Sequence, residues 1–130
     1  MRFVRAEFFG HPSKYHWEIW ERKTKIGEVT YKIYGRYVIL GHLDILPEYR
    51  KQHWGYKAVE YLMKKYPTKS IVGETLSTSA GFWRKCIKRY NGVRKNVNYC
   101  TNCTSSFIIP KRDIPYDELW DCLEIAYKID

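Results

Sequence analysis

The sequence has no apolar run of about 18 residues, so it predicts no membrane-spanning helix. Residues 1–7 lack the apolar segment of a secretory signal peptide, and we therefore expect a cytoplasmic protein. Internal repeats, low-complexity tracts and linkers are also missing, which predicts a single domain over residues 1–130. Hydrophobic residues make up 45% of the chain, and this composition excludes intrinsic disorder.

The chain has only four cysteines, and their spacing is poor for a metal site. Cys100 and Cys103 form a lone CxxC pair, whereas a closed structural zinc site needs four ligands. A hairpin turn explains this spacing without a metal. Cys86 and Cys122 fall in predicted helices, where a thiol packs as a small hydrophobic group. We expect structural cysteines and no metal, with zinc as the less favoured alternative.

The net charge of +9 indicates a polyanionic partner, which is either a nucleic acid or a small molecule. The densest basic stretch, residues 84–95, lies on or after a predicted helix and is also typical of a solvated helix face. No RNA-recognition, helix-turn-helix or zinc-finger pattern accompanies it. Nucleic acid is therefore the less favoured partner.

The order of apolar and polar patterns predicts an α+β domain with a mixed sheet. Strands are expected at residues 3–9, 16–22, 26–33, 37–46 and 70–76, with a closing hairpin of 93–100 and 104–110. Helices are expected at residues 53–66, 79–90 and 115–129.

Residues 46–56, at the junction between a strand and a helix, are the most informative segment of the sequence. Pro47 ends the strand because it lacks an amide hydrogen. The helix that follows begins with up to four unpaired N–H groups and the positive end of its dipole. Arg50 and Lys51 add positive charge. The segment therefore predicts a phosphate-binding turn.

This segment resembles the coenzyme-A-binding signature of the GNAT superfamily of N-acetyltransferases. In that family a strand ends in Val/Leu-x-Pro-Glu-Tyr, and Arg/Gln-x-x-Gly-x-Gly/Ala opens the helix. Arg50 takes the lead position and Gly55 that of the last glycine, while His53 replaces the first glycine. A side chain at residue 53 is tolerable only if it points away from the coenzyme.

The second helix carries a weaker resemblance to the same family, whose pattern is Asn-x-x-Ala-x-x-Phe-Tyr-x-Lys. Ser79, Phe82 and Lys85 match it, whereas Trp83 stands in the tyrosine position and Leu76 in the asparagine position. The resemblance covers roughly residues 15–110. It implies a mixed, mostly antiparallel twisted sheet with helices on both faces, a GNAT-like fold to which residues 115–129 add an extra helix.

The resemblance further implies direct transfer of an acetyl group from acetyl-CoA to a primary amine. In the family the fourth and fifth strands splay apart, and pantetheine lies between them like an added strand. The main chain of Asp44, Ile45 and Leu46 would then pair with pantetheine, while Ser79 and Trp83 would line the thioester. The pyrophosphate would bind the N–H groups of Lys51, Gln52, His53, Trp54, Gly55 and Tyr56.

The general base is less clear from the resemblance, because the family's usual glutamate position falls near Ile39. His42 and Asp44 are the nearest titratable residues and share a strand face, and Glu74 is a third candidate acting through a water molecule. The alternative is that each only forms a hydrogen bond at a sheet edge. For the general acid, Tyr90, Cys86 and water stay open.

The acceptor amine is not readable from the sequence. The family has one or two helices between its first two strands, but residues 10–15 are too few to form them. The helix expected at 115–129 is a candidate substitute. The competing function is a non-catalytic basic module that binds a nucleic acid or a protein, and the closing hairpin could also add strands across a homodimer.

Overall fold

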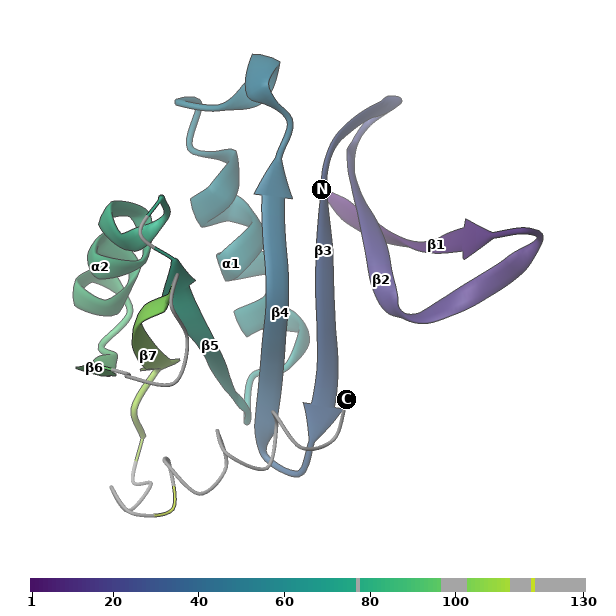
Figure 1. Ribbon diagram of the computed structural model, residues 1–130. Coiled ribbons are helices and arrows are strands. Elements are labelled where there is room, and N and C mark those ends of the chain that lie inside the picture. The colour runs from purple at the N-terminus through teal and green to yellow at the C-terminus, as the bar shows by residue number, and fades with distance from the viewer. Residues whose placement is uncertain (77, 97–102, 113–117, 119–130) are drawn as a thin grey trace.

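The computed structural model describes residues 1–76, 78–96, 103–112 and 118 (Figure 1). The sheet begins with the strands β1 (Arg2–Phe8), β2 (His11–Glu21), β3 (Thr24–Tyr34) and β4 (Tyr37–Ile45). A short 3₁₀ helix η1 (Pro47–Tyr49), α1 (Trp54–Lys65), β5 (Ser70–Leu76) and α2 (Ala80–Arg89) follow. The chain then forms β6 (Val93–Asn96) and β7 (Cys103–Ile109). Among the described residues, no helix combines the length and apolar character needed to cross a membrane.

Every strand and helix expected before residue 110 is present, with its ends shifted by a few residues. The largest difference is at β2, which begins at His11 instead of residue 16. Phe9 and Gly10 have positive φ angles of 53° and 80°, so β1 and β2 form a hairpin. Residues 10–15 thus belong mainly to a strand, and no helix separates the first two strands. Apart from Glu118, the helix expected at 115–129 lies outside the described residues, as do the thiols of Cys100 and Cys122.

The seven strands form one mixed sheet in the order β1-β2-β3-β4-β5-β7-β6. All neighbouring strands are antiparallel except β4 and β5, which are parallel and joined by the crossover through α1. The expected mixed, mostly antiparallel sheet is therefore confirmed.

The main core lies between α1, α2 and one face of the sheet. Val38 of β4 is paired with Ile71 of β5, and Ile71 with Ile109 of β7, so these side chains share a face. They form one buried cluster with Leu62 of α1 and Trp83 of α2. Both described helices therefore cover the same face. Helices on both faces were expected, together with an extra helix at residues 115–129, most of which lie outside the described part of the chain.

A register shift in β4 decides which side chains point away from these helices. Tyr31 of β3 is paired with Leu40, but the preceding Thr30 is paired with His42, so Gly41 is an extra residue in β4. Tyr31 and Leu40 belong to the buried cluster. His42 and Asp44 therefore lie on the opposite face of the sheet.

Close packing between the two helices depends on Gly55 in the first turn of α1. A Cβ atom at Gly55 would lie 2.9 Å from the ring of Phe82 in α2. Tyr56, the next residue, also packs on Phe82, with ring centroids 5.2 Å apart. Gly55 thus fixes how closely α2 approaches the start of α1.

Two helical glycines allow a matched test of this packing. Gly81→Ala in α2 should raise the free energy of unfolding by up to about 1 kcal/mol, because no atom lies within 4 Å of the added Cβ. Gly55→Ala should lose that gain and destabilise by about 1–3 kcal/mol, because Phe82 must move. Urea unfolding of both variants measures the difference. An equal gain at both positions would contradict the packing role of Gly55.

Candidate functional site

The two parallel strands in the centre of the sheet pair along only part of their lengths. β4 and β5 are joined at Tyr37–Ser70, Val38–Ile71 and Ile39–Val72. Both strands continue beyond the last pair, to Ile45 and Leu76, and in Figure 1 they diverge there. Main-chain N–H and C=O groups that face a missing neighbour are obligatory hydrogen-bonding groups. The separated edges can therefore accept an extended ligand as an additional strand.

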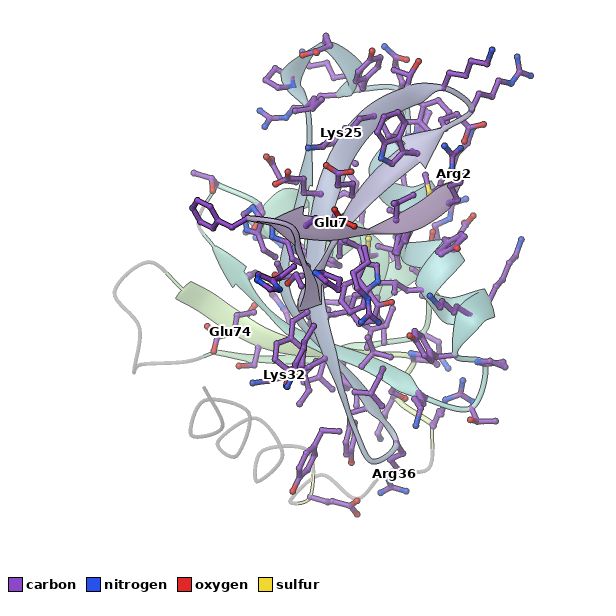
Figure 2. The ribbon with its side chains drawn as sticks, turned by 90° about the vertical axis from the view of Figure 1, so that its right-hand side faces the viewer. Arg2, Glu7, Lys25, Lys32, Arg36 and Glu74 are labelled. Atoms are coloured by element: carbon purple, nitrogen blue, oxygen red, sulfur yellow. The ribbon has the colours of Figure 1, made fainter. Side chains whose placement is uncertain are left out.

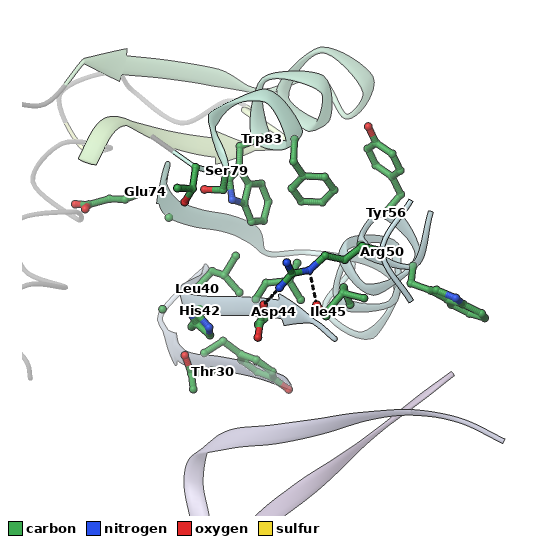
Figure 3. Close-up of a pocket in the computed structure, with 18 of the residues that line it drawn as sticks. Thr30, Leu40, His42, Asp44, Ile45, Arg50, Tyr56, Glu74, Ser79 and Trp83 are labelled. Atoms are coloured by element: carbon green, nitrogen blue, oxygen red, sulfur yellow. Dashed lines mark hydrogen bonds and ion pairs between the residues drawn. The ribbon is translucent and has the colours of Figure 1, made fainter. Parts of the chain in front are cut away.

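A cleft of about 920 Å³ occupies this separation. It extends from the start of α1, past β4 and β3, to β5 and the start of α2, and Figure 3 shows it between these elements. Most of the site residues predicted from the sequence line it, and they are His42, Asp44, Ile45, Arg50, Lys51, His53, Trp54, Gly55, Tyr56, Glu74, Ser79 and Trp83.

Leu46 and Gln52 are the two predicted site residues that do not line the cleft. The N–H of Leu46 donates to the Ile26 carbonyl at 2.8 Å, and its carbonyl accepts from Tyr49 at 2.9 Å. Its main chain is therefore engaged within the protein and is not available to a ligand. The Gln52 side chain donates to the Glu48 carbonyl at 3.3 Å and braces the turn.

The turn before α1 contains two non-glycine residues with positive φ. Lys51 and His53 both adopt left-handed conformations with φ of 64°, and His53 is the N-terminal cap of α1. Histidine is one of the non-glycine residues that tolerate this region, which explains how it stands where the resemblance expects glycine. Its imidazole ring packs against Tyr56, with centroids 5.9 Å apart.

The N–H groups of the first turn of α1 are the donors at this site. The first bond of the helix runs from the Lys57 N–H to the His53 carbonyl at 3.2 Å. The N–H groups of Trp54, Gly55 and Tyr56 therefore have no acceptor within the helix. These residues line the cleft, and Lys51 beside them is exposed. An anionic group of a ligand would meet both these donors and the positive end of the helix dipole.

The side chain of Arg50 lines the cleft and folds back onto the end of β4. Its Nε donates to the Ile45 carbonyl at 2.8 Å, and its terminal nitrogen contacts the Asp44 carboxylate at 3.1 Å (Figure 3). Arg50 thus braces the end of β4. The Ile45 carbonyl and the Asp44 carboxylate, both expected to act in the site, are engaged by this guanidinium.

The protein resembles known proteins in structure but not in sequence. No family model matches the sequence, and no curated protein matches it. A GNAT-family protein from Bacteroides thetaiotaomicron superposes with a TM-score of 0.66 at 14% identity, covering 83% of this chain and 66% of its own. The chain has the GNAT fold.

Two further solved structures share the GNAT fold. The ribosomal-protein-S18-alanine N-acetyltransferase of Escherichia coli has a TM-score of 0.56 at 14% identity, covering 72% of this chain and 64% of its own. The Bacillus subtilis N-acetyltransferase YlbP, in complex with coenzyme A, has a TM-score of 0.55 at 19% identity, covering 78% and 72%. This chain therefore spans about two thirds of the length of the GNAT structures that it matches.

The candidate bases lie on two sides of the cleft in this GNAT fold. His42 is exposed on β4, opposite Thr30 of β3. Glu74 comes from β5, and Figure 3 shows it at the end of the cleft far from Tyr56. Asp44 is held by Arg50, so His42 is the more accessible candidate on β4.

Trp83 and Ser79 bound the cleft on the α2 side. Trp83 is only 5% exposed and stacks on Phe107, with ring centroids 4.5 Å apart, so it forms the floor and belongs to the core. Ser79 caps α2 through its carbonyl, which accepts from the Trp83 N–H at 3.2 Å.

Neither Tyr90 nor Cys86 lines the cleft, so neither is placed to act as a general acid there. The Tyr90 hydroxyl donates to Glu60 at 2.8 Å, and burial raises the pKa of this phenol. Cys86 is fully buried, and burial raises the pKa of its thiol to about 12.

The cleft also contains residues that sequence reasoning missed, namely Tyr15, Thr30 and Lys32 of β2 and β3. The pairing of β3 with β4 brings Thr30 and Lys32 beside the site, and this register depends on the extra residue in β4. No local sequence signal would have found them. Among the described residues, no group of three or more His, Cys, Asp or Glu is placed to hold a metal ion.

Cys86 provides a test of the burial on this side of the core. At pH 8 its thiol should resist iodoacetamide in the native protein and react once the protein is unfolded, because thiolate is scarce when the pKa is about 12. Unfolding lowers that pKa to the ordinary value near 9.0, so stability should fall as pH rises from about 9 toward 12. Peptide mass spectrometry reports the alkylation. Rapid reaction in the native state would contradict the burial.

Proposed function

We propose that this protein is an N-acetyltransferase that transfers an acetyl group from acetyl-CoA to a primary amine. The observation that carries this proposal is the separation of β4 from β5 beyond Ile39 and Val72, which opens toward the first turn of α1. At one end of this cleft, the N–H groups at the start of α1 can donate to a phosphate. Along its length, the unpaired edges of β4 and β5 can bind the amide groups of pantetheine. The coenzyme A complex of the GNAT-fold YlbP supports the choice of ligand.

In this proposal the start of α1 binds the pyrophosphate of the coenzyme. The N–H groups of Trp54, Gly55 and Tyr56 donate to it, and exposed Lys51 adds positive charge. In this arrangement the His53 ring stays beside the Tyr56 ring and the ligand approaches the N–H groups past it. Arg50 contributes indirectly, by bracing the end of β4.

The pantetheine arm lies along the unpaired edge of β4. Between Ile39 and Ile45 the strand is roughly 20 Å long at about 3.3 Å per residue, which suits an extended arm. The main chain of residues 41–44 is the preferred section, because Arg50 occupies the Ile45 carbonyl and Leu46 is engaged internally. The thioester then lies toward the inner end of the cleft, near His42 and Glu74.

His42 acts as the general base in this mechanism. The amine nitrogen attacks the thioester carbonyl carbon, a carbon–nitrogen bond forms, and the carbon–sulfur bond breaks. His42 accepts a proton from the amine, a role that imidazole can fill near neutral pH. Glu74 is the second candidate, acting through water from the β5 side. The departing thiolate takes a proton from water, since Tyr90 and Cys86 lie outside the cleft.

A second candidate function is a basic module that binds nucleic acid or a protein on the GNAT scaffold. The supporting observation is α2, whose sequence has no acidic residue and which exposes Arg84, Lys85, Lys88 and Arg89. Such a surface would bind DNA or RNA with a steep salt dependence, because phosphate contacts release counterions. Absence of binding at low salt would remove this candidate.

Calorimetry with acetyl-CoA tests the primary proposal. The protein should bind the coenzyme, and Lys51→Glu should weaken binding about tenfold, roughly 1.4 kcal/mol, by placing a negative charge beside the pyrophosphate. Lys64→Glu is the matched control, because it makes the same change at an exposed position in the last turn of α1. It should bind like the unaltered protein.

No binding at millimolar acetyl-CoA would overturn the proposed function. Equal weakening by Lys51→Glu and Lys64→Glu would instead overturn the assignment of the turn and indicate an effect of net charge alone. Gly55 is a poor site for this test, since any side chain there meets Phe82 and disturbs the helix packing.

A further inference from the structure

A lysine of the protein itself lies in the cleft, at the point where the strands separate. Lys32 lines the cleft and is half-buried. It is paired across β3 and β4 with Ile39, which is also the last residue of β4 paired with β5. Figure 2 shows Lys32 on β3, between Lys25 at one end of the strand and Arg36 beyond the other. Its amine therefore comes from the strand next to the inner end of the cleft.

The candidate base lies beside this lysine on the same face of the sheet. His42 is paired with Thr30, and Lys32 follows Thr30 by two residues, so His42 and Lys32 are diagonal neighbours on adjacent strands. Diagonal neighbours on adjacent strands lie about 7–8 Å apart, a separation that long side chains can span. Both side chains line the same cleft. The strand register thus places a lysine and the candidate base at neighbouring positions of one cleft.

The thioester of a bound coenzyme would be near this pair. The pyrophosphate donors are at the open end of the separation, at the start of α1, and Ile39 marks its closed end. A pantetheine arm that is held at the open end and runs along β4 would present its thioester toward the closed end. Lys32 and His42 lie at the closed end. Lys85 also lines the cleft, but it comes from α2.

We propose that Lys32 is an internal acceptor and that the protein acetylates its Nζ atom. This inference rests on the proposed acetyl transfer. The Lys32 ammonium gives one proton to His42, which passes it to solvent, and the neutral amine attacks the thioester carbonyl carbon. The new amide bond forms as the carbon–sulfur bond breaks, and the second amine proton goes through water to the thiolate. The products are acetyl-Lys32 and coenzyme A, and the cleft loses one positive charge.

The test is a time course of the purified protein with acetyl-CoA, followed at each lysine by peptide mass spectrometry. Acetylation of Lys32 should be about tenfold or more faster than that of Lys64 or Lys85, because the amine is held beside the thioester. Its rate should not depend on protein concentration, since the reaction is intramolecular. Lys32→Arg keeps the charge and should remove this rapid modification.

His42→Gln should slow acetylation of Lys32 about a hundredfold and leave the slow chemical acetylation of exposed Lys64 unchanged. Thermal melts and acetyl-CoA calorimetry check that the variant is folded and binds the coenzyme. Heat-denatured protein provides a second control if this variant does not fold, because in it Lys32 should react no faster than Lys64.

Two outcomes distinguish a failure of this inference from a failure of the proposed function. If acetyl-CoA binds but Lys32 is acetylated no faster than Lys64, or at a rate proportional to protein concentration, the internal acceptor is refuted and the proposed function stands. If acetyl-CoA does not bind at millimolar concentration, the proposed function and this inference both fall.

Discussion

The site depends on the incomplete pairing of the parallel strands β4 and β5, which ends at Ile39 and Val72. The parallel arrangement requires a crossover, and α1 supplies it on one face of the sheet. At 12 residues α1 is about 18 Å long, so its first turn lies far from the start of β5 and near the open end of the strand separation. The anion donors and the unpaired strand edges thereby face one cleft.

Three local features shape this cleft. Gly55 lets Phe82 of α2 approach the first turn of α1, and this contact positions the helix that follows β5. The extra residue at Gly41 turns His42 and Asp44 away from the helix-packed core and toward the other face. Arg50 then braces the end of β4 by binding Ile45 and Asp44. Aromatic packing, strand register and one guanidinium together define the cleft.

Local sequence patterns were sufficient for the elements and for the strand–turn–helix junction before α1. Pro47, the helical spacing after it and the β-rich run before it are short-range signals, so the junction at residues 46–56 was predictable. The GNAT fold followed from the same segment and the order of elements. His53 could replace the expected glycine because histidine accepts a left-handed conformation.

The remaining features depend on contacts that distant segments make. Lys32 reaches the cleft through the β3–β4 register, which a single extra residue shifts. Arg50 was expected at the phosphate, but the strand end offers it both a carboxylate and a carbonyl acceptor. Trp83 lines the cleft as expected, but the sequence did not indicate that it is also a buried core residue stacked on Phe107. Sequence spacing does not report such competition between partners.

Amide-resolved NMR during titration with coenzyme A observes each main-chain N–H group of the proposed binding site separately. The largest shifts should occur at the N–H groups of Trp54, Gly55 and Tyr56 and along β4 beyond Ile39. Shifts confined to the basic face of α2, with these amides unchanged at saturation, would contradict it.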